Sequence, residues 1–237
     1  MPDYQPPFRI TDRVINTVAA ISELLGQWSG AAKTALTPTL RRGNRIRTIQ
    51  ASLAIEHNTL SVEQVTAVLE GKRVLGLPRE IQEVRNAFAT YDQLERYDPC
   101  NFDDLLHAHR QLMHGLIDDA GALRSGGVGI YREQQLVHMA PPASQLHRLM
   151  TSLLHWLQHT DAHPLVASCV FHYEFEFIHP FSDGNGRMGR LWQTLILSRW
   201  RPVMSYVPVE TVIHQQQDQY YEALAQADRA SDATPFL

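Results

Sequence analysis

The chain has 237 residues, enough to bury a full hydrophobic core in one domain with an extension. Its 21 Lys and Arg against 25 Asp and Glu give a formal net charge of −4, which argues against broad nucleic-acid binding. Cys100 and Cys169 lie far apart and outside any metal-ligand spacing, so neither a disulfide framework nor a zinc site is predicted. The first residues lack a signal segment and no run of eighteen apolar residues occurs, so we expect a cytoplasmic protein without a membrane span.

The first hundred residues have the pattern of helices. Apolar residues at helical spacing predict four of them, over residues 10–25, 41–58, 62–70 and 78–97. Ser61 and Gln64 form a capping-box pattern before the third helix, and Gly71 is placed to end it. On the second helix Glu56 falls on an otherwise apolar stripe, so this helix would present a carboxylate from its apolar face.

The rest of the chain continues the helical pattern with one interruption. Helices are predicted over residues 102–116, 146–159, 164–178 and 188–200. The exception is residues 126–139, where apolar Val128, Ile130, Leu136 and Val137 surround a polar tip at residues 132–135 and predict a short hairpin. The expected fold class is therefore all-α, a helical bundle with a small β-hairpin.

Residues His179 to Arg190 read His-Pro-Phe-Ser-Asp-Gly-Asn-Gly-Arg-Met-Gly-Arg and join two predicted core helices. Gly184 and Gly186 let the backbone approach a ligand closely, and the helix that follows would direct its unpaired N–H groups at an anion. Arg187 and Arg190 are i and i+3 neighbours on that helix, so both guanidinium groups could reach successive phosphates of one ligand. The segment predicts a polyphosphate site.

Two further side chains of this segment supply chemistry. Asp183 is a hard oxygen ligand that suits Mg²⁺ completed by phosphate oxygens and water. His179 is a proton acceptor, because an unperturbed histidine titrates near neutral pH. Competing interpretations fit less well. A hairpin turn at Asn185-Gly186 conflicts with the helical run after it, an EF-hand loop would match only Asp183 and Asn185, and His172 with His179 lacks a third zinc ligand.

The same segment resembles the signature of the Fic family, His-x-Phe-x-Asp/Glu-Gly-Asn-Gly-Arg-x-x-Arg, with every fixed position matched. The resemblance extends from the arginine-rich helix near Arg41 to Tyr220-Tyr221, over most of the chain. It implies an all-α fold with a small hairpin, and an enzyme that transfers AMP from ATP to a hydroxyl of a target protein. Residues 1–100 would form a helical extension that contains an inhibitory helix, and residues 101–237 the Fic catalytic domain.

The resemblance also implies roles for individual residues. His179 would be the general base that takes the proton of the acceptor hydroxyl, and Asp183 would hold the Mg²⁺ that bridges the α- and β-phosphates. Arg187 and Arg190 would bind the β- and γ-phosphates. The ATP site implied comprises Gly184, Asn185 and Gly186 as an anion hole, with Arg187, Met188, Gly189, Arg190, Tyr220 and Tyr221. The two tyrosines either stack on the adenine or pack in the core.

The predicted hairpin corresponds, by this resemblance, to the flap of the family, which docks a target segment by strand addition. The flap residues implied are Val128, Gly129, Ile130, Val137 and His138. The alternative is a hairpin with a purely structural role.

A second match concerns regulation. The sequence from Ser52 to Glu56 resembles the inhibitory-helix pattern of the family, Ser/Thr-x-x-x-Glu-Gly/Asn, except that His57 stands where glycine or asparagine is usual. Ser52 and Glu56 are i and i+4 neighbours, so Glu56 could pair with Arg190 and deny it to the γ-phosphate. The alternative is that both are solvated residues of a surface helix. In some relatives the same glutamate supports removal of AMP.

We therefore expect an adenylyltransferase that uses ATP and Mg²⁺, is autoinhibited by Glu56, and modifies a Ser, Thr or Tyr of a target protein or of itself. The sequence leaves open whether the protein forms a homodimer. Open alternatives for the activity are removal of AMP, transfer of UMP, phosphate or phosphocholine at the same site, and a nucleotide-sensing module for a C-terminal domain. No membrane partner and no nucleic-acid partner is expected for this segment.

Overall fold

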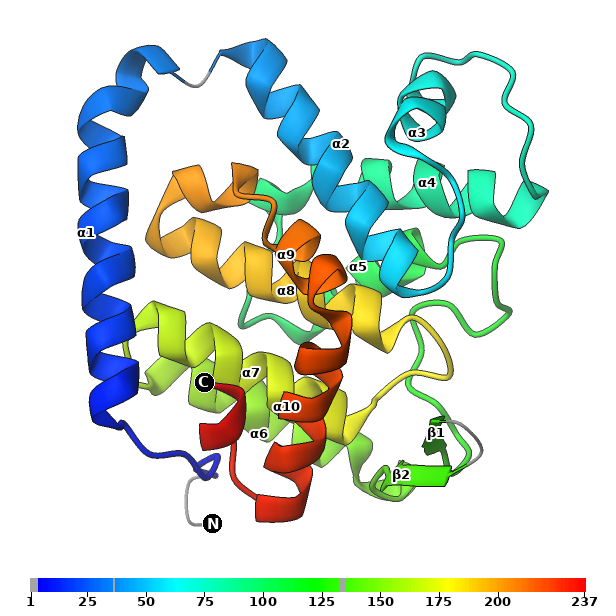
Figure 1. Ribbon diagram of the computed structural model, residues 1–237. Coiled ribbons are helices and arrows are strands. Elements are labelled where there is room, and N and C mark those ends of the chain that lie inside the picture. Colours follow the sequence, from blue (N-terminus) through cyan, green and yellow to red (C-terminus); the bar gives the residue numbers. More distant parts are fainter. Residues whose placement is uncertain (1–3, 36, 133–134) are drawn as a thin grey trace.

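The computed structural model describes residues 4–35, 37–132 and 135–237. This part of the chain is a bundle of helices with one two-stranded hairpin (Figure 1), which confirms the predicted all-α class. The helices are α1 (Asp12–Ala35), α2 (Pro38–Ile55), α3 (Val62–Leu69), α4 (Pro78–Asp92), α5 (Phe102–Leu112), α6 (Leu146–His159), α7 (Pro164–Ile178), α8 (Asn185–Trp200), α9 (Val209–Gln215) and α10 (Gln217–Ala230). The strands are β1 (Gly129–Arg132) and β2 (Gln135–Met139).

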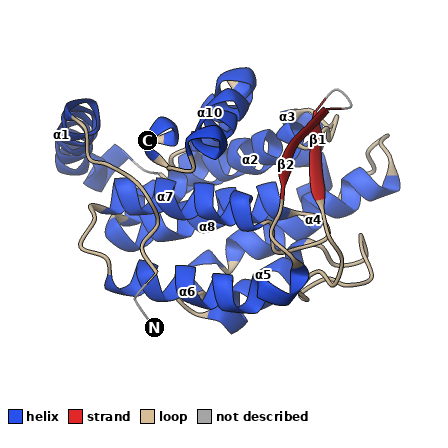
Figure 2. Ribbon diagram, turned by 90° about the horizontal axis from the view of Figure 1, so that it is seen from below, coloured by secondary structure: helices blue, strands red, loops and turns tan. Residues whose placement is uncertain are grey.

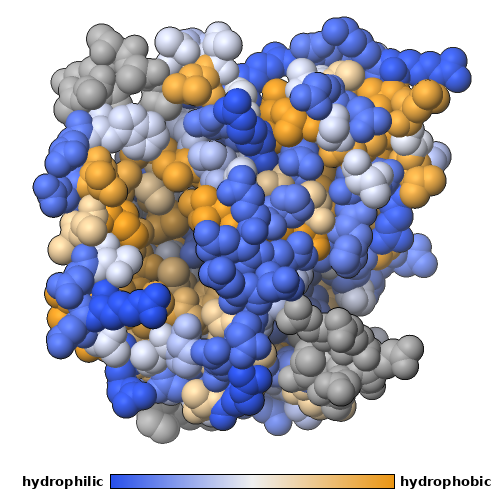
Figure 3. All heavy atoms as spheres, in the orientation of Figure 1, coloured by the Kyte–Doolittle hydropathy of each residue, from blue (hydrophilic) through white to orange (hydrophobic). Residues whose placement is uncertain are grey.

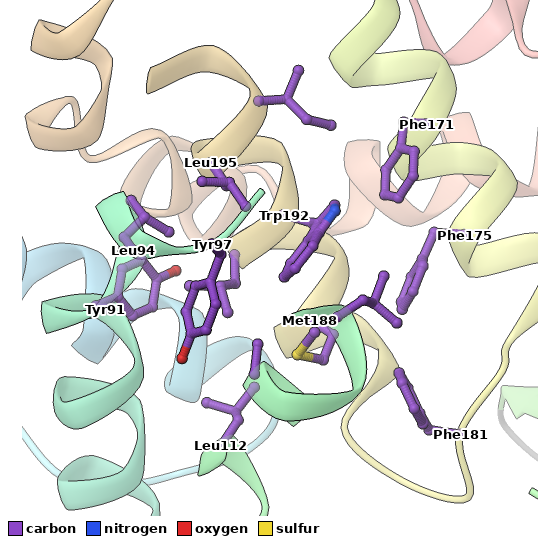
Figure 4. Packing of buried hydrophobic residues seen from close by; sticks show 14 of the residues in the cluster. Tyr91, Leu94, Tyr97, Leu112, Phe171, Phe175, Phe181, Met188, Trp192 and Leu195 are labelled. Carbon is purple, nitrogen blue, oxygen red and sulfur yellow. The ribbon is translucent and has the colours of Figure 1, made fainter. Parts of the chain in front are cut away.

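Helices α7 and α8 pack against each other in the centre of the bundle, and both are buried over much of their length. Val166, Val170 and Tyr173, which lie at helical spacing on α7, are buried. Figure 4 shows the core side chains around α8: Tyr91, Leu94, Tyr97, Leu112, Phe171, Phe175, Phe181, Met188, Trp192 and Leu195. The segment that joins α7 to α8 is therefore fixed to the core at both ends.

Helices α2, α3 and α4 lie next to one another, and α2 also packs against α8 and α9. The predicted capping box starts α3, because Ser61 Oγ accepts from the Gln64 N–H at 3.3 Å and Gln64 Oε1 accepts from the Ser61 N–H at 2.9 Å. Gly71 follows the end of α3 with φ of 70°, as expected of a residue that ends a helix. These contacts set the last turn of α2 close to the first turn of α8.

Several helix ends differ from the predictions, for local reasons. Helix α1 continues past Leu25 to Ala35, α4 ends at Asp92 before a separate 3₁₀ turn at residues 94–96, and α5 ends at Leu112 ahead of Gly115, whose φ is 68°. No helix was predicted beyond Trp200, yet α9 and α10 follow it. In α10 Ala227 is buried and the partly buried Leu224 packs against the core.

The hairpin stands at one end of the bundle (Figure 2), within the segment predicted to form it. Its strands are antiparallel, with Gly129 opposite Met139 and Ile130 opposite His138, and the register shifts after Ile130. Residues 133–134 of the predicted tip lie outside the described part of the chain. No helix among the described residues is long and apolar enough to cross a lipid bilayer.

Candidate active site

A cavity of about 960 Å³ opens where the ends of α2 and α7 meet the starts of α8 and α10. Its lining includes Glu56, His138, Glu176, His179, Gly186, Arg190, Tyr220 and Tyr221. The wall along α9 and α10 contains the glutamines 215–217, and Figure 3 shows hydrophilic side chains over the middle of this face. The volume is within the range of pockets that enclose a small organic ligand.

His179 caps α7 in a left-handed backbone conformation, with φ of 49° and ψ of 61°. Its N–H donates to the Phe175 carbonyl at 2.9 Å, and its Nδ1 lies 3.4 Å from the Glu176 carbonyl oxygen. Burial lowers the pKa of His179 to about 4. The imidazole is therefore neutral near pH 7 and can accept a proton from a group in the cavity.

The segment between α7 and α8 is braced by its own side chains. Asn185 Oδ1 accepts from the Phe181 N–H and its Nδ2 donates to the Phe181 carbonyl, both at 2.9 Å. Gly184 has φ of 85°, and a Cβ there would lie 2.6 Å from Met113 Sδ, so the position requires glycine. Asn185 thus shapes the turn through its side chain, while the first N–H groups of α8 have no partner within the helix.

Arg190 is nearly fully buried and contacts Ser52 of α2 and Glu56, the residue that caps α2. Its Nε donates to Ser52 Oγ at 3.1 Å, and its Nη2 donates to the Ser52 carbonyl at 2.9 Å and to Glu56 Oε1 at 2.7 Å. Burial opposes the charge of Arg190, but Glu56 raises its pKa above the ordinary value. A Cβ at Gly186 would lie 2.4 Å from Glu56 Oε1, so Glu56 occupies the space directly against the first turn of α8. The ion pair expected between Glu56 and Arg190 is therefore present.

Arg187 and Asp183 belong to a second ionic cluster, which includes α4. Arg187 Nη2 lies 3.1 Å from Asp183 Oδ1, and Arg187 Nη1 lies 3.5 Å from Glu83 Oε1. Arg79 closes the cluster, because its Nη2 lies 3.2 Å from Asp183 Oδ2 and its Nε lies 3.5 Å from Glu83 Oε1. Both arginines of the motif are thus paired with carboxylates of the N-terminal helices, Arg190 with Glu56 and Arg187 with Glu83.

The end of α2 has the geometry of a Schellman motif. The Asn58 N–H donates to the Leu53 carbonyl at 3.1 Å and the His57 N–H to the Ala54 carbonyl at 3.0 Å, while His57 has φ of 68°. A left-handed residue is needed here, which explains in physical terms why glycine or asparagine would suit the position of His57. Asn58 Nδ2 also donates to Glu83 Oε2 at 2.8 Å, which links this turn to the second ionic cluster.

Asp183 is the residue of this site suited to a divalent cation. Its carboxylate is 42% exposed and provides hard oxygen donors. Among the described residues no group of three or more His, Cys, Asp or Glu side chains could hold a metal ion. A divalent cation bound at Asp183 would therefore need further ligands from outside the chain, such as phosphate oxygens and water.

Of the other residues predicted for the ATP site, some line the cavity and others lie in the core or between helices. Tyr220 and Tyr221 line the cavity, and Tyr220 Oη lies 2.8 Å from His172 Nε2. Met188 is fully buried in the core, so its side chain does not face a ligand. Gly189 faces α7, where a Cβ would lie 2.6 Å from Glu176 Oε1, so it serves the close approach of the two helices.

In the hairpin, His138 is the predicted residue that lines the cavity. Its Nε2 lies 2.7 Å from the Phe177 carbonyl oxygen and its Nδ1 lies 3.1 Å from Asp228 Oδ2. The Val128 carbonyl accepts from the Ala140 N–H at 3.1 Å, and Gly129 pairs with Met139. The side chains of Ile130 and Val137 lie outside the described part of the chain.

Sequence reasoning missed several residues of the site. Arg124 and His109 reach its backbone from distant positions, and no local spacing could have indicated either of them. Glu176 lines the cavity, and burial raises its pKa to about 7. Its position four residues after His172 and three before His179 was a signal that could have been used.

Comparison with known proteins gives the family. The family model described as "Fic/DOC family" matches residues 99–197. A solved structure of a Fic family protein from Desulfovibrio desulfuricans G20 is 65% identical, with a TM-score of 0.95, and the match covers 98% of this chain and 72% of that one. A structure of Fic-1 from Caenorhabditis elegans is 25% identical, with a TM-score of 0.70, and covers 94% of this chain and 69% of that one.

Curated relatives with the name protein adenylyltransferase Fic also match. That of Nematostella vectensis is 30% identical over 205 residues, which are 80% of this chain and 44% of the relative. That of Culex quinquefasciatus is 30% identical over 224 residues, 86% of this chain and 41% of the relative. The chain thus spans less than half the length of these relatives. With most of its length matched at 65% identity to a Fic family protein, and with the complete motif in place, the chain belongs to the Fic family.

Proposed function

We propose that this chain is a protein adenylyltransferase that transfers AMP from ATP to a side-chain hydroxyl, and that Glu56 holds it in an inhibited state. The observation that carries the proposal is the contact of Arg190 with Ser52 and Glu56 beside the neutral imidazole of His179. One cavity thereby contains a base, a helix N-terminus, an arginine and a carboxylate that pairs with it. The names of the curated relatives support the same activity.

The chemistry follows from these groups. The Nδ1–H of His179 faces the Glu176 carbonyl, which leaves Nε2 as the proton acceptor. As the acceptor oxygen bonds to the α-phosphorus, its proton passes to Nε2, and the bond from phosphorus to the bridging oxygen breaks to release pyrophosphate. The first N–H groups of α8 stabilise the negative charge on the phosphates, and the arginines stabilise the leaving group. Asp183 would hold Mg²⁺, which supplies charge neutralisation at the phosphates when bound.

The inhibition is a competition for one guanidinium group. Arg190 can pair with Glu56 or with the γ-phosphate. The Glu56 carboxylate is already fixed at the end of a packed helix, so little reorganisation is needed for it to keep the guanidinium group of Arg190. Glu56 Oε1 also lies 2.4 Å from the position that a Cβ of Gly186 would take, so its negative charge would repel phosphates at the start of α8. ATP would then bind without the geometry for transfer.

The proposal assigns residues 1–100 to a regulatory extension and residues 101–237 to catalysis. This division is supported by the family match at residues 99–197 and by the contacts from Ser52, Glu56 and Glu83 to the motif. The acceptor would be a protein segment beside the hairpin, and a reducing, cytoplasmic setting is consistent with the free thiols Cys100 and Cys169.

The test is intact-mass spectrometry after incubation with ATP and Mg²⁺. We expect an AMP-sized mass gain in Glu56→Gly, little in the wild type, and none in Glu56→Gly with His179→Ala. Glu70→Gly is the matched control, because Glu70 caps α3 as Glu56 caps α2 but pairs with Lys72 at the surface. It should behave as the wild type.

The outcomes separate the alternatives. If Glu56→Gly binds ATP but gains no mass, α-labelled ATP and a cell extract test for transfer to another protein. Absence of labelling there as well would remove the transferase assignment. Retention of ATP affinity and biological activity in His179→Ala would instead indicate a nucleotide sensor, since binding needs no base.

A further inference from the structure

Arg124 is a buried arginine that contacts only backbone oxygens in the hydrogen bonds of the described residues. It is 4% exposed and lies between α5 and β1. Its Nε donates to the His179 carbonyl at 2.7 Å, its Nη1 to the Gly126 carbonyl at 2.6 Å, and its Nη2 to the carbonyls of Pro141 and Ile178 at 2.7 and 3.3 Å. Burial lowers the pKa of Arg124, and no carboxylate pairs with it among the ion pairs of the described residues.

The four oxygens belong to two parts of the proposed active site. Gly126 and Pro141 stand at the two ends of the segment that contains the hairpin, whereas Ile178 and His179 end α7. The main-chain N–H of Arg124 adds a fifth hydrogen bond, because it donates to the Pro180 carbonyl at 3.0 Å. One residue therefore joins both ends of the hairpin to the residue that would act as the base.

The chemistry of arginine suits this junction. The last carbonyls of a helix have no partner within it and carry partial negative charge, so a buried cation there is favourable. His179 holds a left-handed backbone, which a residue with a side chain adopts only when its surroundings impose it. A planar guanidinium with five donors can reach several carbonyls in fixed directions, whereas the ammonium of lysine is a single point.

We propose that Arg124 is a positioning residue, which sets the distance between a protein segment docked on the hairpin and the imidazole of His179. The inference rests on the proposed function, because it concerns the geometry of that transfer. Arg124 does not line the cavity, so it acts through the backbone of His179 and of the hairpin base and not by contact with ATP.

The experiment uses the full chain with Glu56→Gly as the active background. Arg124→Lys and Arg124→Ala are compared with the control Arg199→Lys. Arg199 also donates to backbone carbonyls, those of Glu95 and Tyr97, but it lies away from the cavity. We expect Arg124→Lys to slow transfer at saturating ATP by about 10- to 100-fold, the order of loss caused by a small misplacement of reacting groups. Its dissociation constant for ATP should change by less than about two-fold, because Arg124 makes no contact with ATP in this proposal and its loss should affect the transfer step alone.

Two further measurements exclude a merely structural role. Free guanidinium, but not ammonium at the same concentration, should restore part of the rate of Arg124→Ala. Hydrogen exchange should become faster in residues 126–141 and 179–184 together in both Arg124 variants, with the rest of the bundle unchanged. This second readout needs no activity, so it tests the inference even if the Glu56→Gly background transfers no AMP and the proposed function fails.

The proposal is overturned if Arg124→Lys keeps the full rate of an active background, or if exchange changes in only one of the two segments. It is also overturned if both Arg124 variants lose their cooperative thermal transition, because Arg124 would then serve the stability of the whole fold.

Discussion

At the scale of single residues, the site contains two histidines in left-handed backbone conformations, His57 and His179. Such a conformation costs an L-residue roughly 1–2 kcal/mol. At His179 the conformation turns the chain from α7 into the motif. At His57 it ends α2 directly after Glu56, so the cost arises next to the carboxylate that we propose to be inhibitory.

Replacing His57 with glycine should stabilise the protein. Glycine adopts φ of 68° freely, but it also gives the unfolded chain more conformational entropy. We therefore expect a net increase in the free energy of unfolding of about 0.5–1 kcal/mol. Urea unfolding at equilibrium measures it. His57→Ala keeps the unfavourable conformation and is the matched control, so an equal gain in both variants would contradict the explanation.

The imidazole of His179 should remain neutral well below neutral pH. Burial lowers its pKa to about 4, against about 6.5 for an unperturbed histidine. Its Cε1–H resonance, identified by its absence in His179→Gln, should hardly move between about pH 7 and pH 5 and should titrate near pH 4. A midpoint near 6.5 would show that the ring is hydrated in solution and that the base loses its competence under mildly acidic conditions.

At the scale of elements, the sequence predicted best those features that depend on neighbouring residues. Helix α6 has the predicted bounds, and the capping box of α3 is present, because periodicity and caps are local. The contiguous motif indicated the site for the same reason. Arg124 and Glu83 could not be predicted, since each reaches the motif across a long stretch of chain and has no local pattern. Helix α10 was missed although Tyr220, Leu224 and Ala227 lie at helical spacing, so a local signal for it was present in the sequence.

Helix α4 contributes Arg79, which pairs with Asp183, the carboxylate that would hold Mg²⁺ in the proposed mechanism. Arg79 and Arg187 both pair with Asp183, and a cation bound there would meet their repulsion. Arg79→Ala removes one positive charge from a solvent-accessible site, where such a pair is worth about 1 kcal/mol at most. We expect Mn²⁺, in the presence of a non-hydrolysable ATP analogue, to bind up to about five-fold more tightly, with little change in stability.

Electron paramagnetic resonance of free Mn²⁺ measures this affinity without catalysis. Arg148→Ala is the control, because Arg148 is an exposed arginine of α6 that donates to Gln145. Equal Mn²⁺ affinities in the wild type and Arg79→Ala would show that Asp183 does not hold the cation or that Arg79 leaves it when the nucleotide binds.

At the scale of the whole molecule, the cavity is closed by elements that are far apart in the sequence. Its walls come from the turn after α2, the hairpin, the core helices α7 and α8, and helices α9 and α10. His138 joins three of these, since its ring lies between β2, the Phe177 carbonyl of α7 and Asp228 of α10. Both of its nitrogens face acceptors, so the geometry favours a doubly protonated, charged ring.

This contact should make the anchoring of the hairpin depend on pH. Burial lowers the pKa of His138, but the hydrogen bond and charge of Asp228, with the Phe177 carbonyl, raise it above the ordinary value, against a weaker opposing effect of Arg124. A raised pKa in the folded state means that the stabilisation is complete below about pH 6.5, the unfolded value, and is lost as pH rises through the folded pKa.

We expect His138→Gln to unfold at a lower temperature than the wild type at about pH 6, by the equivalent of about 1.5–3 kcal/mol, the range for a hydrogen bond to a charged group. The difference should narrow as pH rises through the raised pKa of His138 in the folded state, because the wild-type ring then loses its charge. Asp228→Asn keeps an acceptor but removes the negative charge, so its difference from the wild type should narrow in the same way. A difference in His138→Gln that stays constant with pH would mean that the ring is neutral throughout, and that it holds the hairpin by packing against the Phe177 ring and by its bond to the Phe177 carbonyl.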